Sequence, residues 1–386
     1  MTVTATDSIY ISGRIIEGNE MYQSAIISST YGDGNGGTIS ISTPSLTIDD
    51  GALAAETALG AESGGDILVE VGDLTISNGG LISSVAFGSG QGGNVTVTAA
   101  DSISILGRDI DGLPSRITSG ANSGAGGDIT LEAPEIELSD GVIISTESFG
   151  VGNAGDISIT ASDTFHSNNS SVTTAAEQAE GGDINITTRE MQLLNGTIVS
   201  AESSGAGNAG NIHLAATDSF LMRDSAVTTE AKQADGGNIK VSAGYMVYLI
   251  DSEITASVGG GPETVGGNIN IDPEYVILKN SKIIANAYEG MGGNISIVAD
   301  VFLADPDSIV DASSALGIDG QVNIRAPVKE ITGTFAPLPK DFLSALALLR
   351  EPCMARIQGG KYSSFVVGGR DGLPLEPGGL LPSPIF

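Results

Sequence analysis

Short runs of alternating apolar and polar residues recur along most of the chain, separated by glycine-rich segments. In the stretch that begins at Gly126 these runs are DITLEA, PEIELSDG and VIISTES, followed by the polar loop FGVGNA. Alternation with a period of two and many β-branched residues indicate strands, whereas Gly, Asn and Asp between the runs indicate corners. No unit shows a helical pattern of ten residues. Each unit is therefore expected to contain three short strands.

The units repeat at a nearly constant interval. Each opens with a small residue and a Gly, usually followed by Asp or Asn and then by Ile or Val. The second small residue occurs at Gly37, Gly65, Gly93, Gly127, Gly155, Gly182, Gly210, Gly237, Gly267, Gly293 and Gly320. Successive intervals are 28, 28, 34, 28, 27, 28, 27, 30, 26 and 27 residues. Regular repetition of this length is typical of solenoids, in which every unit forms one turn.

The repeat predicts an all-β fold, a parallel β-helix of about eleven coils of ~27 residues that occupies residues 1–325. Each strand should pair in parallel with its equivalent in the next coil, at a spacing of ~4.8 Å. Each coil would bury its apolar side chains only against its neighbours, so that stability becomes a sum of nearest-neighbour terms. The interior should contain columns of like residues, one of them formed by Ile157, Ile184, Ile212, Ile239, Ile269 and Ile295.

The 34-residue interval marks the one long insertion. It falls in GRDIDGLPSRITSG, around residues 109–115, and is expected to project from the rod as a loop. Its charged residues form the only mixed charge cluster of the repeat region, namely Arg108, Asp109, Asp111 and Arg116. Two interpretations remain open, a solvated loop and a loop that contacts a glycan. A smaller excursion, VGGGPETVGG, surrounds Thr264 and Val265.

Residues 326–386 differ in composition from the repeats. They contain eight of the 14 prolines, and they carry six basic and five acidic side chains, against ten basic and 42 acidic ones before them. The segment DFLSALALLR, residues 341–350, predicts a short helix with Asp341 as N-cap and Pro352 as a stop. We expect this helix to cover the open end of the β-helix, where unpaired backbone groups invite aggregation. Recognition of a partner by the SSFVV segment is the alternative.

Charge and hydropathy exclude several classes of partner. The formal net charge of −31 opposes binding to nucleic acids and to anionic lipids. No apolar stretch approaches the ~20 residues of a membrane-spanning segment. The single cysteine, Cys353, allows no internal disulfide. The first residues alternate like a strand and lack the features of a signal peptide, so the chain is expected to be either cytoplasmic or the C-terminal portion of a longer exported protein.

The Asp or Asn that follows each small-Gly pair has two interpretations. Asp128, Asp156 and Asp183 fall on consecutive coils, and stacked carboxylates supply the oxygen ligands that calcium prefers. The spacing lacks, however, the nonapeptide pattern of calcium-binding β-helices. Asn and Asp also favour corners, because their side chains bond to nearby backbone N–H groups and tolerate left-handed geometry. We favour the corner-forming interpretation.

Residues suited to catalysis are sparse. His166 and His213 are the only histidines, and together with one cysteine they cannot build a usual zinc site. The arginines of the repeat region are scattered, at Arg14, Arg108, Arg116, Arg189, Arg223 and Arg325. Both histidines are expected to be solvated strand or loop residues. The sequence predicts no catalytic, cofactor-binding or metal-binding residues.

Several phrases resemble those of filamentous haemagglutinin-type large exoproteins, which act in adhesion or haem utilisation. They are GNAGDISITASD at Gly152, GAGNAGNIHLAATD at Gly205, LSDGVIISTES and LNGTIVSAES. The tail CMARIQGGKYSSFVVGGRDGLPLEPGGLLPSP, from Cys353, is similar to the C-terminal signature of this group. The resemblance implies a right-handed β-helix exported by two-partner secretion, in which an outer-membrane transporter recognises an N-terminal secretion domain. This chain would be the C-terminal portion of such a protein.

The resemblance and the repeat together suggest a non-enzymatic structural and adhesive rod, secreted or held at the cell surface. It would attach to host or neighbouring cells, with a glycan as one candidate ligand. The alternatives are a polysaccharide-active β-helix enzyme, either lyase or hydrolase, and a truncated remnant without independent function.

Overall fold

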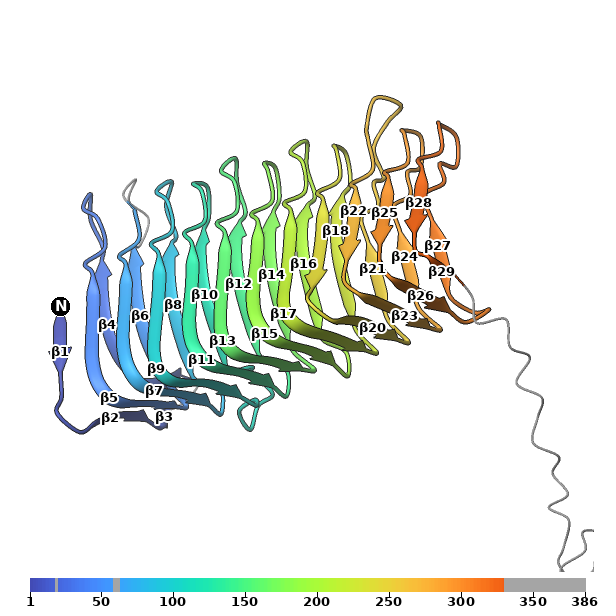
Figure 1. Ribbon diagram of the computed structural model, residues 1–386. Helices are drawn as coiled ribbons and strands as arrows, with labels where there is room; N and C mark the ends of the chain where they lie inside the picture. The colour runs from blue at the N-terminus through green and yellow to red at the C-terminus, as the bar shows by residue number, and fades with distance from the viewer. Residues whose placement is uncertain (18–19, 58–62, 330–386) are drawn as a thin grey trace, which may run out of the picture. The chain divides into compact units, whose positions relative to one another are not determined.

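The repeat region folds as a parallel β-solenoid of about eleven turns, and the part of the chain that the structure describes contains no helix. The computed structural model describes residues 1–17, 20–57 and 63–329, which lie in the compact unit Met1–Ile331. Figure 1 shows the coils stacked one after another, with their loops along one edge. The expected helix at residues 341–350, the SSFVV segment and Cys353 lie outside the described residues.

Among the described residues, each coil contributes strands to two sheets, one of 17 and one of 12 strands. The first sheet contains β1 (Thr2–Thr4), β2 (Ser8–Ser12), β5 (Ile39–Asp49), β7 (Ile67–Ser77), β9 (Val95–Leu106), β11 (Ile129–Ser139), β13 (Ile157–Asn168), β15 (Ile184–Leu194), β17 (Ile212–Arg223), β19 (Ile239–Ala243), β20 (Met246–Ile250), β22 (Ile269–Asp272), β23 (Tyr275–Lys279), β25 (Ile295–Val298), β26 (Val301–Ala304), β28 (Val322–Arg325) and β29 (Val328–Lys329).

The second sheet holds the last strand of each coil. It contains β3 (Arg14–Glu17), β4 (Glu20–Thr30), β6 (Gly51–Thr57), β8 (Leu81–Ala86), β10 (Arg116–Ala121), β12 (Ile143–Ser148), β14 (Ser171–Ala176), β16 (Ile198–Ser203), β18 (Ala226–Ala231), β21 (Glu253–Thr255), β24 (Lys282–Ile284) and β27 (Ile309–Asp311). The strands of both sheets pair in parallel with their equivalents one coil away. The hairpin of β3 and β4 is antiparallel.

The expectation of three separate strands is correct for the first coil, which has β1 and β2, and again toward the C-terminal end. From β5 to β17, the first two runs of a coil form one bent strand, and a register shift marks the bend, as between Ala133 and Glu135 in β11. Pro134 occupies that bend, where the ladder loses a donor. From β19 onward the runs separate into two strands, such as β19 and β20. At this bend, which is the first corner of the coil, the chain changes direction without reversing. Most hydrogen bonds of the parallel ladder therefore continue on both sides of it.

The predicted column of isoleucines is confirmed. Ile157 lies opposite Ile184 in β15, and the same register continues through each later coil. All six side chains are at most 1% exposed. The column also extends backward to Ile39, Ile67, Val95 and Ile129. A parallel column holds the two largest buried side chains, Phe165 and Phe220, on either side of Met191.

The repeated glycines mark a place where consecutive coils approach closely. A Cβ atom added to Gly182 would overlap the carbonyl oxygen of Gly155, and one added to Gly210 would overlap the carbonyl oxygen of Gly182. The same relation joins Gly237 to Gly210 and Gly267 to Gly237. Glycine is required here because any side chain would occupy the position of the preceding coil's backbone.

Left-handed backbone geometry occurs at a different corner from the one we expected. The non-glycine residues with positive φ lie between the first-sheet strand and the second-sheet strand, at Asp50, Asn78, Asp140, Asn169, Asn195, Asp224, Asp251 and Asn280. Asp128, Asp156 and Asp183 are not among them. Asn and Asp tolerate this conformation better than other side-chain-bearing residues. The Asp and Asn residues of this second corner are therefore explained by their left-handed backbone conformation. Those that follow the small-Gly pairs must have a different cause.

Candidate binding surface

The Asp and Asn residues after the small-Gly pairs connect consecutive coils. The Oδ1 atom of Asp128 accepts the backbone N–H of Asp156 at 2.9 Å, and Oδ1 of Asp156 accepts that of Asp183 at 2.8 Å. The same bond recurs from Asp66 to Gln321, with every partner one coil further along the chain. From Asn211 to Asn294 the Nδ2 of each Asn adds a second bond, as from Asn211 to Oδ1 of Asp183 at 3.0 Å. These residues form a ladder that satisfies one backbone donor per coil.

The ladder explains the three consecutive carboxylates without a cation. Their Oδ1 atoms are already used as hydrogen-bond acceptors, and the described residues contain no group of three or more His, Cys, Asp or Glu side chains that could hold a metal ion. Burial raises the pKa of Asp156 above its ordinary value, and the flanking carboxylates of Asp128 and Asp183 raise it further, against the backbone N–H of Asp183. The ionised carboxylate of Asp156 is therefore electrostatically unfavourable in the folded protein, whereas the neutral amide of an Asn at this position would not be.

We expect Asp156→Asn to stabilise the solenoid by roughly 0.5–1 kcal/mol at pH 7, the net value of one added hydrogen bond. The amide keeps the Oδ1 acceptor, gains a donor toward Asp128 and removes the like-charge contacts. Because the folded-state pKa of Asp156 is raised, the folded protein binds this proton more tightly than the unfolded chain does. The contribution of Asp156 to stability falls as the pH rises above the ordinary carboxyl range.

Denaturant unfolding of both proteins between pH 3 and pH 8 checks this prediction, since the advantage of the Asn variant should grow across that interval. Asn211→Asp is the matched reverse change, because it extends the stack to four carboxylates and should destabilise. A pH-independent difference between Asp156→Asn and the original chain would contradict the electrostatic explanation.

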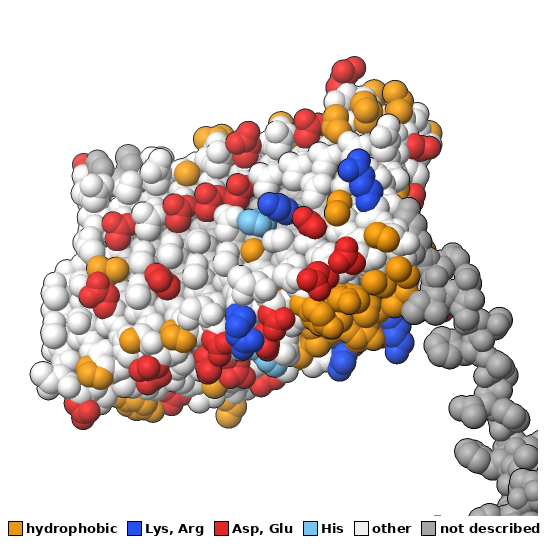
Figure 2. Space-filling view, viewed as in Figure 1, with side chains coloured by type: hydrophobic (Ala, Val, Ile, Leu, Met, Phe, Trp, Pro, Cys, Tyr) orange, Lys and Arg blue, Asp and Glu red, His pale blue; other side chains and the backbone are white. Residues whose placement is uncertain are grey.

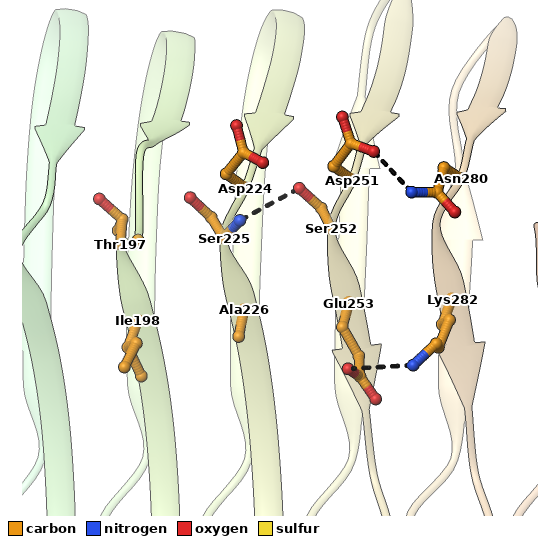
Figure 3. Close-up of a pocket in the computed structure, with 11 residues that line it drawn as sticks. Thr197, Ile198, Asp224, Ser225, Ala226, Asp251, Ser252, Glu253, Asn280 and Lys282 are labelled. Carbon is orange, nitrogen blue, oxygen red and sulfur yellow. Dashed lines mark hydrogen bonds and ion pairs between the residues drawn. The ribbon is translucent and has the colours of Figure 1, made fainter.

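A shallow groove runs along the left-handed corner across several coils. It has a volume of about 540 Å³ and is lined by Gly196, Thr197, Ile198, Asp224, Ser225, Ala226, Asp251, Ser252, Glu253, Asn280 and Lys282. Figure 3 shows Asn280 bonded through Nδ2 to Oδ1 of Asp251, at 2.6 Å, and Lys282 paired with Glu253 at 3.9 Å. Most of its polar groups thus already serve contacts between coils.

Hydroxyl groups form a second ladder beneath this groove. The backbone N–H of Ser225 donates to Oγ of Ser252, and that of Ser252 donates to Oγ of Ser281. Each serine Oγ also donates to the carbonyl oxygen two residues before it, at 2.7 to 2.8 Å. These serines are buried, so their hydrogen bonds are internal. The groove is therefore first of all a structural seam, although the carboxylates of Asp224 and Asp251 remain at its surface.

The inserted loop is tied to the first coil at its base, while residues 110–113 beyond that point are exposed. Arg14 of the first coil bonds Asp109 at 2.7 Å, Asp50 at 2.6 Å and Asp111 at 3.0 Å. The side chain of Asp109 is 1% exposed, and its Oδ1 also accepts the backbone N–H groups of Asp111 and Leu113. At the tip, Ile110 is 95% exposed and Leu113 is 44% exposed.

The four charged residues of the insertion do not form one cluster. Asp109 and Asp111 turn toward Arg14, whereas Arg108 donates from Nη1 to the carbonyl oxygen of Gly112 at 3.0 Å. Arg116 is the first residue of β10. The three-carboxylate contact of Arg14 was not predicted because its partners are up to 97 residues away in sequence.

We expect Asp109→Ala to release the inserted loop from the first coil. The change removes an acceptor used by Arg14 and by two backbone donors, so the amides of Asp111 and Leu113 should exchange hydrogen faster. Burial alone would raise the pKa of Asp109, but its bonds to Leu113, Arg14 and Asp111 hold it below the ordinary value. Its stabilising effect is therefore present at neutral pH and is lost as the pH falls through this depressed pKa.

Hydrogen exchange at pH 7 measures the effect, and Asp111→Ala is the matched control. The carboxylate of Asp111 also contacts Arg14, but it is 62% exposed and should matter little. Equal exchange in the two variants would show that burial of Asp109 does not anchor the loop.

The two histidines occupy the outer surface of the first sheet. His166 lies between Glu137 and Gln192 on neighbouring strands, in a hollow of about 240 Å³ that also includes Glu135. His213 faces Lys240 in the next coil. Partial burial and the positive charge of Lys240 lower the pKa of His213. Both are partly exposed, as expected, and they stand on different parts of the sheet.

Large apolar side chains are exposed on the loops that follow the second-sheet strands. Figure 1 shows these loops in a row along one edge of the solenoid, and we call this row the loop edge. Its exposed apolar side chains are Tyr31, Phe87, Phe149, Val151, Val265, Tyr288, Met291, Leu316 and Ile318. Single exposed apolar residues are common on protein surfaces, but here they recur in corresponding loops of one edge. Our sequence reasoning missed them, although a lone Phe before Gly in the polar loops FGSG and FGVG was the available signal.

The ion pairs of Arg189 are a second set of contacts that the sequence did not indicate. It bonds Asp163 at 2.7 Å and Glu190 at 2.5 Å, and Asp218 lies 3.7 Å away. The partners come from three consecutive coils, and all of them are partly exposed. This network joins neighbouring coils. No arginine is among the residues that line the hollow beside His166.

Comparisons with protein families, curated proteins and solved structures find no match. Within its described residues, the chain contains no helix long and apolar enough to cross a membrane.

Proposed function

We propose that this chain is a non-enzymatic structural and adhesive rod of a secreted or cell-surface exoprotein. The observation that carries the proposal is the loop edge, where exposed Tyr, Phe and aliphatic side chains recur on one side of the solenoid. Exposed apolar groups in such an arrangement are typical of protein and cell-surface contacts. The resemblance to filamentous haemagglutinin-type exoproteins points in the same direction.

The architecture supports this role because it holds the loops at regular intervals. Consecutive coils are joined by backbone ladders in both sheets, by the Asp and Asn ladder and by the serine ladder. Bending the rod would break several of these bonds at once, so the loops keep their spacing of ~4.8 Å per coil. A series of weak contacts held on one rigid support binds more strongly than any of its members alone.

Adhesion of coated beads tests the proposal. Beads carrying the purified chain should be retained on epithelial cells or on bacterial cells, and Phe87→Ser combined with Phe149→Ser should reduce retention several-fold. Tyr10→Ser combined with Ile198→Ser is the matched control, because these exposed residues lie on the sheets and not on the loop edge. Retention no greater than that of beads coated with the heat-unfolded chain would contradict adhesion by this fold.

A polysaccharide-active enzyme is the second candidate, and the hollow that contains Glu135, Glu137 and His166 is the observation that favours it. Carboxylates and an imidazole in one hollow can transfer protons to and from a sugar substrate. Incubation of the chain with pectate or alginate, with and without calcium, separates the two proposals. Cleavage that is lost in Glu137→Gln would overturn the non-enzymatic assignment.

A further inference from the structure

The outer surface of the first sheet changes character in the last coils. Between β9 and β15, the outward positions of the second run hold polar residues such as Ser104, Glu137, His166 and Gln192. From β17 onward one column of these positions is apolar, and from β20 onward a second column is apolar as well, its β17 member being Ser219. One column is Leu221, Tyr248, Ile277 and Leu303, and the other is Met246, Tyr275, Val301 and Val328.

We call these eight residues, together with Tyr245, the apolar face. Tyr245 is 49% exposed, and its ring lies 5.1 Å from that of Tyr275. The remaining members are partly exposed, and Val328 is the most exposed of them at 42%. In Figure 2 the face forms one continuous apolar patch on this side of the molecule. A contiguous patch of this kind on a soluble surface marks an interaction site.

The two borders of the apolar face carry opposite charges. Asp272, Glu274 and Asp300 lie just before the strands that form it. Arg223 and Lys279 end β17 and β23 on the opposite border, and the carboxylates of Asp224 and Asp251 next to this border line the groove of the left-handed corner. Figure 2 shows acidic side chains above the patch and basic side chains below it. The pattern therefore runs from negative through apolar to positive along the direction of the strands.

We propose that the apolar face binds the same face of a second copy of this chain. A two-fold axis parallel to the stacking direction of the coils would place the acidic border of each copy against the basic border of the other. The apolar columns would then cover one another at the centre, and the two solenoids would run side by side in the same direction. The polar coils before β17 would stay outside the contact.

The size of the face sets the expected affinity. Four coils at ~4.8 Å and five residues at ~3.3 Å give roughly 300 Å² per copy, which is below the usual ~800 Å² of a stable complex. The flanking borders enlarge the contact only modestly. We therefore expect a dimer with a dissociation constant of roughly 10–100 μM, weak enough to need concentrated protein or several rods in parallel.

Sedimentation equilibrium of the full chain, from roughly 1 μM to 0.5 mM, measures the association around the expected dissociation constant. Ile277→Asp should abolish the dimer by placing a charge at the centre of the contact. Ile27→Asp, at an exposed apolar position on β4 in the other sheet, should leave it unchanged. Both side chains point outward, and unchanged thermal melting of each variant confirms that only association is altered.

A charge exchange tests the orientation. Lys279→Glu and Glu274→Lys should each weaken self-association by roughly three- to tenfold, since the two-fold axis repeats every pair. A mixture of the two variants should recover association, because each then meets a complementary border. A monomer over the whole concentration range, or a dimer insensitive to Ile277→Asp, would overturn the proposal.

Discussion

Replacing Gly237 by Ala is expected to destabilise the solenoid by about 3 kcal/mol, at the upper end of overpacking effects. A Cβ atom at this position would overlap the carbonyl oxygen of Gly210 in the preceding coil. The obstacle is backbone, and it cannot move aside as the end of a flexible side chain can. Relief would require the two coils to separate, which would lengthen the ladder bonds on both sides of the corner. Equilibrium unfolding in urea measures the loss.

Gly261→Ala provides the matched control. Gly261 lies in the excursion between β21 and β22, and an added Cβ there would meet nothing within 4 Å. Its stability should stay within roughly 0.5 kcal/mol of the original, as for most surface substitutions. Equal unfolding midpoints for the two alanine variants would show that the coils can separate freely and that close approach does not explain the repeated glycine.

Phe220→Ala should cost about 3–5 kcal/mol, the usual range for removing a buried phenyl ring. Phe220 is 1% exposed and stands in register between Met191 and Val247. The core is narrow, because it is enclosed within the strands of each coil. Few neighbouring side chains can therefore move into the cavity that the phenyl ring would leave. Phe149→Ala, which truncates a ring that is 49% exposed on the loop edge, should change stability little.

The same variant should also alter the pattern of unfolding. Because each coil contacts only its neighbours, a weak coil divides the rod into two cooperative units. Hydrogen exchange of Phe220→Ala should show early opening of β15 to β20, while the amides of β5 to β11 remain protected. Uniform loss of protection along the whole rod would contradict the nearest-neighbour description.

The repeat interval and the alternation of residues were sufficient to predict the coil and its register. Ile157, Ile184 and Ile212 could be aligned from spacing alone, because a parallel ladder places equivalent residues opposite one another. The regular spacing of the glycines also came from the sequence. Its cause, the contact between backbones at Gly210 and Gly237, became apparent only when the coils were stacked.

Other features depended on geometry that no local pattern encodes. An Asp side chain can accept a hydrogen bond from a backbone N–H of its own turn or from one in the next coil. The neighbouring residues in the sequence do not distinguish the two cases. The structure assigns Asp128 and Asp156 to bonds between coils and assigns left-handed geometry to Asp140 and Asp224. The insertion was recognisable from its length, but its anchorage to the first coil depends on Arg14, which lies 95 residues before Asp109.

The fold class, the length of the coil and the residues of the interior follow from local periodicity and from the hydrophobic effect acting on it. The stacking of the coils, in contrast, decides which outward-facing residues become neighbours. The loop edge, the apolar face and the contact of Arg14 with Asp109 join residues from different coils, and their positions depend on how each coil is rotated and bent relative to the next.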